Sequence, residues 1–221
     1  TNLPDPTIED GSTYFDAIPY NGNGSSLSVT GSNFSPDLVW IKDRQAPFNH
    51  GLYDTVRGAT KGLAPNVTDA EYTESQSLTS FDSNGFTLGN WVGENNNTAP
   101  YVAWAWDAGS STVSNTVGSI TSSVRASQTS GFSIVSYTGN STVGATIGHG
   151  LNAQPGLVII KNRDRSIRWV VGHSAVNGFS SGKQLYLDNT SAFASNENYF
   201  NGTAPTSSVF TVKDNYEVNY A

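Results

Sequence analysis

The sequence contains one nine-residue stretch twice, as PDLVWIKDR at residues 36–44 and as PGLVIIKNR at residues 155–163, 119 residues further on. Each copy begins with proline, continues through an apolar run and ends in polar residues. A short apolar run bounded in this way is typical of a buried β-strand. We therefore expect both copies to form strands, and the second, from Leu157 to Ile160, to be a central strand of its sheet.

Other stretches recur in the same order around this pair. The segment at residues 20–24 (YNGNG) matches residues 137–141 (YTGNS), displaced by 117, and residues 86–88 (FTL) match residues 210–212 (FTV), displaced by 124. A displacement that grows slowly indicates a duplicated unit with variable loops. We predict an N-terminal segment at 1–13, a first β-unit at 14–109, a Ser/Thr-rich linker with short edge strands at 110–130, and a second β-unit at 131–221.

The composition favours an all-β fold. Aromatic residues make up 11% of the chain, and the remainder is rich in Gly, Ser, Thr and Asn. Strand-forming residues separated by turn formers at short intervals predict two related units of β-sandwich or jelly-roll type. In the strand expected at residues 101–106, Tyr101, Ala103 and Ala105 should share one face, and Trp104 and Trp106 the other. Because this strand is apolar throughout, we expect both tryptophans in the core.

The second unit has no counterpart of this last strand before Ala221. We therefore expect an open sheet edge, with exposed side chains of Val209, Phe210 and Val212. Isolated proteins avoid such edges because they promote aggregation. We expect material beyond Ala221 or a neighbouring subunit to supply the strand, and several copies to assemble around a symmetry axis.

Charge and residue usage exclude several classes of protein. With 11 Lys and Arg and a net charge of -7, the chain lacks the basic clusters of nucleic-acid binders. There is no apolar run long enough to span a membrane. The absence of cysteine excludes disulfides, thiolate nucleophiles and Cys-ligated zinc. We predict no cofactor and no metal site, and no spacing resembles a calcium loop.

Taken together, these stretches resemble a repeat found in tail-fibre and other exterior structural proteins of phages that infect marine bacteria, notably cyanobacteria. The resemblance covers nearly the whole chain from Asp5 onward, and the segments that carry it are residues 6–11, 36–44, 56–58, 78–89, 131–139, 148–151 and 204–210. It implies a location on the virion exterior, other phage structural subunits as partners, and a second copy that ends in a strand like that at residues 101–106. This chain departs from the pattern by stopping before that strand.

Few residues suggest chemistry. His50, His149 and His173 fit ordinary turn or surface histidines, and no Gly-x-Ser-x-Gly motif marks a nucleophile. The densest acidic cluster, Asp69, Glu71 and Glu74, would be the place for a glycosidase pair, although it lies in a polar stretch that resembles a solvated loop.

Trp91 is the candidate for an exposed carbohydrate-stacking platform, because polar residues surround it. We therefore predict a non-enzymatic tail-fibre or appendage module that supports host recognition, with a host cell-surface glycan as a ligand. The alternatives are a capsid decoration or head-fibre protein, a stand-alone carbohydrate-binding module, and a polysaccharide depolymerase.

Overall fold

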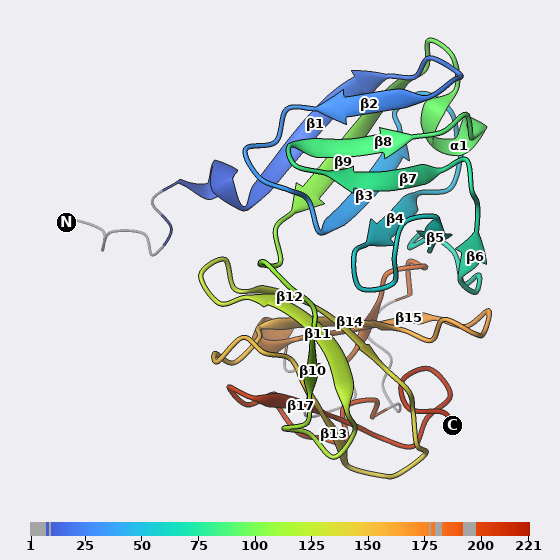
Figure 1. Ribbon diagram of the computed structural model, residues 1–221. Helices are drawn as coiled ribbons and strands as arrows, with labels where there is room; N and C mark the ends of the chain where they lie inside the picture. Colours follow the sequence, from blue (N-terminus) through green and yellow to red (C-terminus); the bar gives the residue numbers. More distant parts are fainter. Residues whose placement is uncertain (1–7, 9, 177, 180–182, 192–197) are drawn as a thin grey trace, which may run out of the picture.

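The computed structural model describes residues 8, 10–176, 178–179, 183–191 and 198–221. Nearly all of its regular structure is β, in several small antiparallel sheets, so the prediction of an all-β fold is confirmed. The strands divide into a first half, up to residue 109, and a second half, from residue 110, which lie one above the other in Figure 1.

The first half is a two-layer sandwich (Figure 1). One layer has the strand order β1-β9-β3-β4 and the other β2-β8-β7, with β5 and β6 forming a small separate pair. A 3-10 turn, η1 (Gly11–Thr13), precedes them, and a single helical turn, α1 (Val92–Asn95), precedes β9. The strand bounds are β1 (Phe15–Asn21), β2 (Leu27–Thr30), β3 (Leu38–Asp43), β4 (Gly51–Asp54), β5 (Lys61–Gly62), β6 (Tyr72–Thr73), β7 (Leu78–Asp82), β8 (Gly85–Leu88) and β9 (Pro100–Trp106).

The core of the first half lies between these two layers. Val39 and Ile41 of β3 face Phe86 and Leu88 of β8, and all four side chains are almost completely buried. Alternating burial along β3 follows from the period of two that a strand imposes on its side chains. One face of the four-stranded layer therefore points into the sandwich, and its other face points outward.

The second half is built from smaller sheets. Their strand orders are β10-β11-β12, β14-β15-β16 and β13-β17, and a 3-10 turn, η2 (Ser174–Val176), follows β15. The bounds are β10 (Val113–Asn115), β11 (Ser122–Ser127), β12 (Phe132–Tyr137), β13 (Ala145–Gly148), β14 (Leu157–Lys161), β15 (Trp169–His173), β16 (Leu185–Tyr186) and β17 (Val209–Val212). Both β10 and β11 lie within residues 110–130 and extend the sheet of β12, while Ile120 packs in the core of this half.

Two strand pairs have the same register in both halves. In the first half Val39 lies opposite Tyr53, and in the second Val158 lies opposite Gly172, each residue displaced by 119. Similarly, Val29 pairs with Phe86 and Ile147 pairs with Phe210. A duplicated unit would have registers that match in this way, and the duplication itself stays a prediction.

Two expectations about the second half are wrong. Leu157 and Ile159 of β14 are 51% and 43% exposed, because β14 pairs only with β15 among the described strands and is an edge strand. Conversely, Phe210 and Val212 of β17 are buried, because β17 belongs to the opposite layer and faces Tyr137 across the core. Among the described strands of this half, β12 and β14 are both edge strands of their sheets.

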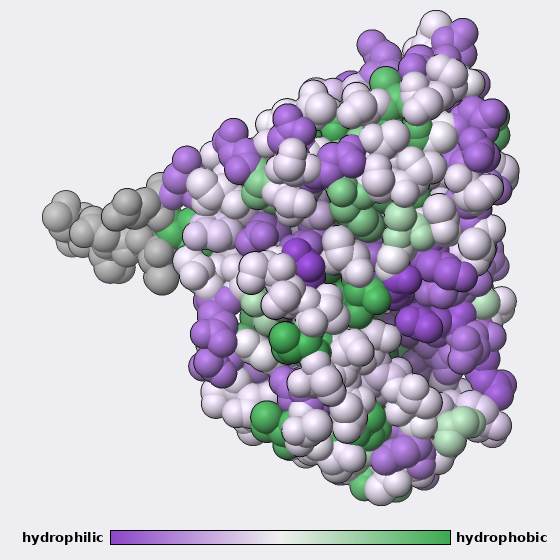
Figure 2. Space-filling model, viewed as in Figure 1, coloured by the Kyte–Doolittle hydropathy of each residue, from purple (hydrophilic) through white to green (hydrophobic). Residues whose placement is uncertain are grey.

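On the face shown in Figure 2, apolar residues form small separate patches among residues of intermediate or hydrophilic character. Among the described residues, no helix is long and apolar enough to cross a membrane.

Candidate functional site

The central strand of the first half, β9, places its two tryptophans on the outer face of the sheet. Tyr101, Ala103 and Ala105 are fully buried against the opposite layer, whereas Trp104 and Trp106 are half-buried on the outer face. The predicted division into two faces is correct, but the expectation that both tryptophans are core residues is wrong. The opposite layer already fills the interior with Phe86 and large aliphatic side chains, so mainly alanine fits on the inner face of β9.

The sheet register brings further rings onto this outer face. Trp40 of β3 lies opposite Trp104, and the two indoles meet edge to face with centroids 6.2 Å apart. The Trp40 Nε1–H donates a 2.8 Å hydrogen bond to Nδ1 of His50, and this bond restrains the orientation of the indole. Burial, with the nearby charge of Lys42, lowers the pKa of His50, so the imidazole accepts this bond in its neutral form.

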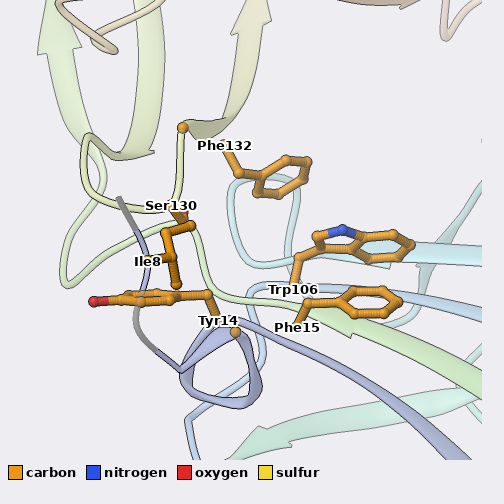
Figure 3. A pocket seen from close by; sticks show the side chains of 8 residues that line it. Ile8, Tyr14, Phe15, Trp106, Ser130 and Phe132 are labelled. Carbon is orange, nitrogen blue, oxygen red and sulfur yellow. The ribbon is translucent and has the colours of Figure 1, made fainter. Parts of the chain in front are cut away.

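A second aromatic group lies at the end of β9. Phe15 of β1 pairs with Trp106 at a centroid distance of 5.0 Å. Phe132, at the start of β12 in the second half, stacks on the other side of Trp106 with centroids 6.0 Å apart and the ring planes 23° apart. Figure 3 shows the three rings side by side.

These rings border a cavity of about 290 Å³ between the halves (Figure 3). The other lining residues are Ile8, Gly11, Tyr14, Ser130 and Gly131. The polar side-chain groups of these lining residues are the hydroxyls of Tyr14 and Ser130 and the indole N–H of Trp106, and the Ser130 hydroxyl is directed to backbone carbonyls at 3.4 and 3.5 Å. The cavity can therefore accept an apolar or amphipathic ring, and none of the described residues that line it carries a charged side chain.

We refer to the outer rings together as the aromatic strip, which comprises His50, Trp40, Trp104, Trp106, Phe15 and Phe132. Side chains two apart on a strand are about 7 Å apart, so Trp104 lies one such step from Trp106, whose ring is contacted by Phe15 and Phe132. Aromatic rings that combine apolar faces with polar edges suit ligands with both kinds of surface. The aromatic strip can therefore bind an uncharged ligand by stacking.

Trp91, the residue singled out from the sequence, lies apart from these contacts. It is 40% exposed at the start of α1, and the neighbouring Val92 is 48% exposed. Its backbone is fixed, since its N–H donates to Gln76 O at 2.9 Å and its carbonyl accepts from Asn95 N at 2.9 Å. The exposure predicted for the ring is present, but Trp91 has no ring contact with another described aromatic side chain.

The histidines do not converge. His50 is bonded to Trp40, His149 accepts from the backbone N–H of Leu151, and His173 accepts from that of Ala175. His149 is only 3% exposed, so it is a buried turn residue and not a surface one. Within the described part of the chain, no three His, Asp or Glu side chains come together to hold a metal ion.

The acidic cluster also differs from its expected environment. Glu71 is partly buried and pairs with Arg57 at 3.1 Å and with Arg163 of the second half at 3.5 Å. Asp69 is exposed, and Glu74 accepts a hydrogen bond from the backbone of Gln76. Glu71 is therefore part of the contact between the halves, while Asp69 is exposed as expected for a solvated loop.

Sequence reasoning missed one perturbed acid, Glu94 of α1. This side chain is 3% exposed, and burial raises its pKa to about 7. The hydroxyl of Tyr53 donates to its Oε1 at 2.9 Å, and the Tyr72 hydroxyl lies 3.0 Å from that of Tyr53. The short sequence Val92–Asn95 gives no sign of burial, because burial there depends on how α1 packs over β3.

A family model described as a domain of unknown function, DUF7483, matches residues 10–221. The chain belongs to the DUF7483 family. No curated protein and no solved structure matches the chain. All six residues of the aromatic strip, both halves and Trp91 lie inside the DUF7483 match, so each is part of the family domain itself.

Proposed function

We propose that this DUF7483 chain is a non-enzymatic recognition module that binds a saccharide of a cell surface through the aromatic strip. The observation that supports it is the orientation of β9, which places Trp104 and Trp106 on the outer face of the sheet, partly exposed, while Tyr101, Ala103 and Ala105 face the core. Burying large apolar side chains stabilises a fold far more than burying alanine. The partly exposed tryptophans on the outer sheet face leave apolar surface that a ligand can cover.

The chemistry of the strip favours binding over cleavage. Glycoside hydrolysis needs two carboxyl groups on either side of the scissile bond. The titratable member of the strip is His50, whose Nδ1 already accepts the Trp40 bond, and Glu71 is held between two arginines away from the rings. A stacked sugar would meet aromatic faces and hydroxyl groups but no acid–base pair.

We further propose that the module lies on the exterior of a phage particle, in a tail fibre or similar appendage, with other virion subunits as partners in a symmetric homo-oligomer. The resemblance of residues 36–44, 78–89 and 131–139 to exterior phage proteins supports this location. In a map of the particle, the chain should occupy symmetric density at the tail. Density on the capsid face would instead identify a decoration protein, and absence from the particle would contradict the virion assignment.

Binding by the strip is tested by titrating the protein with soluble host-surface polysaccharide and following tryptophan fluorescence and heat. Trp104→Ala and Trp40→Ala should each weaken binding more than about tenfold, because removing a central aromatic contact at a binding surface costs roughly 2 kcal/mol. Trp104→Phe keeps a ring and should retain part of the affinity.

Trp91→Ala is the matched control, since Trp91 is also exposed but lies outside the strip. It should bind as the wild-type protein does. If Trp91→Ala abolishes binding while both strip variants bind normally, Trp91 is the platform and the proposal fails. New reducing ends during incubation would contradict the non-enzymatic assignment.

A further inference from the structure

The hydrogen bonds that surround β9 in the first half have counterparts in the second half. In the first half, the turn after β1 is held by Asn95, whose Oδ1 accepts from Asn23 N at 2.7 Å and whose O accepts from Gly24 N at 3.0 Å. In the second half, Asn219 accepts from Asn140 N at 2.9 Å and from Ser141 N at 3.0 Å. The same side-chain and backbone atoms are bonded in each case.

The aromatic contacts beside these hydrogen bonds are also shared. The Tyr20 hydroxyl donates to Glu94 O at 2.7 Å, and the Tyr137 hydroxyl donates to Val218 O at 2.5 Å. Each tyrosine meets a phenylalanine of the opposite layer edge to face, with centroids 6.2 and 6.1 Å apart. Thus β12 stands where β1 does, and the matching register of β14 with β15 places β14 where β3 is.

No described strand lies between β12 and β14. In the first half, β9 fills this position and pairs with β1 on one side and β3 on the other. In the second half, β12 pairs only with β11 and β14 only with β15 among the described residues. We call the space between their free edges the acceptor slot.

Backbone donors mark the edges of the acceptor slot. Around β9, the N–H groups of Gly22, Asp37 and Arg44 donate to Ala99, Trp106 and Pro100 at 2.8 to 2.9 Å. The corresponding N–H groups are those of Gly139, Gly156 and Arg163, and none of them donates to a backbone carbonyl in the part of the chain that the structure describes. Unpaired donors along two facing edges are the basis of recognition by strand addition.

Side-chain exposure agrees with an empty position. Val39 of β3 is completely buried beneath β9, whereas its counterpart Val158 is half-buried. Trp40 is half-buried, whereas its counterpart Ile159 is 43% exposed. A strand in the acceptor slot would cover both Val158 and Ile159.

We propose that the acceptor slot binds one extended peptide segment with the side-chain pattern of β9, antiparallel to both β12 and β14 and drawn from polypeptide other than residues 1–221. Its inner face carries an aromatic residue followed by two small ones, as Tyr101, Ala103 and Ala105 do in β9. Its outer face carries apolar residues that cover Leu157 and Ile159. The β9 of a second copy does not fit, because ladders on both sides already hold it.

The test uses the whole 221-residue protein and a synthetic peptide with the sequence of residues 100–106, PYVAWAW, flanked by lysines for solubility. Hydrogen exchange is measured amide by amide with and without the peptide, and stoichiometry by light scattering. In the free protein, the amides of Gly156 and Arg163 should exchange at least about tenfold faster than those of Asp37 and Arg44. With the peptide, they should slow by about the same factor in a 1:1 complex.

The control peptide carries Ala103→Arg, which places a charge against the core and should give no protection. Protection of amides in β1 and β3 alone would show that the peptide replaces β9 in the first half. Equal protection by the control peptide would show unspecific binding. A homodimer in which β12 and β14 are protected without peptide would show that a second copy is the occupant. Each of these outcomes, like the absence of any protection, overturns the proposal.

Discussion

At the scale of single residues, Glu94 is a buried acid of the first half whose protonation affects stability. Its carboxyl accepts from Tyr53 through one oxygen, while the other oxygen has no hydrogen-bond partner among the described residues. Burial disfavours the charged form, and the nearby charge of Glu74 acts in the same direction. The folded protein therefore prefers Glu94 protonated.

This preference predicts a pH dependence of stability. The folded pKa of about 7 lies above the ordinary value of 4.5, so the stabilisation is fully present below about pH 4.5 and is lost as the pH rises through 7. At 1.36 kcal/mol per pH unit, the free energy of unfolding should fall by about 3 kcal/mol between pH 4.5 and 8. Chemical denaturation across this range measures it.

The Glu94→Gln variant isolates the effect, because glutamine still accepts from Tyr53 but does not titrate. Burial also raises the pKa of Asp37, which adds a slope of the same sign in both proteins. In the Glu94→Gln variant, the free energy of unfolding should therefore depend on pH much less than in the wild-type protein, but some dependence should remain. An unchanged slope in Glu94→Gln would exclude Glu94 as the source.

At the scale of elements, local pattern locates strands but not their neighbours. The alternation of residues 101–106 correctly assigned Tyr101, Ala103 and Ala105 to one face. Which face meets the core depends on how much volume the opposite layer fills, and a single strand does not contain that information. The aromatic strip was missed for this reason, since it requires the register that brings Trp40 beside Trp104.

The apolar run of β14 illustrates the same limit. An uninterrupted run of apolar residues fits a central strand with two neighbours, and β14 has one neighbour among the described strands. The sequence predicts an open edge at β17, whereas β17 pairs with β13 and its Phe210 and Val212 are buried. Among the described strands, β12 and β14 each pair with a single neighbour, on the side away from the further strand that is proposed, and β17 belongs to the other layer.

At the scale of the whole molecule, polar contacts hold the halves together. Asp37, before β3, pairs with Arg125 of β11 at 2.7 Å and accepts from Ala108 N at 2.9 Å. Glu71 accepts from Arg57 and Arg163, and the Trp169 indole donates to Val67 O at 3.1 Å. These contacts between the halves could not be predicted from local sequence patterns, because the residues that they join lie far apart along the chain.

Two arginines of this interface should differ in their contribution to stability. Arg125→Ala leaves the Asp37 carboxyl, 1% exposed, without its cation, so the free energy of unfolding should fall by about 2–3 kcal/mol. Arg163→Ala removes a 43% exposed partner of Glu71 and should cost less than about 1 kcal/mol. Denaturant titration of both variants checks the order, and equal losses would contradict it.

The stacking of Phe132 on Trp106 places one end of the aromatic strip on the second half and the remainder on the first. A stiff sugar chain lying along the strip would therefore touch both halves at once. When such a module is pulled between its anchor and a cell, the ligand would carry part of the load across the junction. Ligand binding would then strengthen the contact between the two halves while it is under tension.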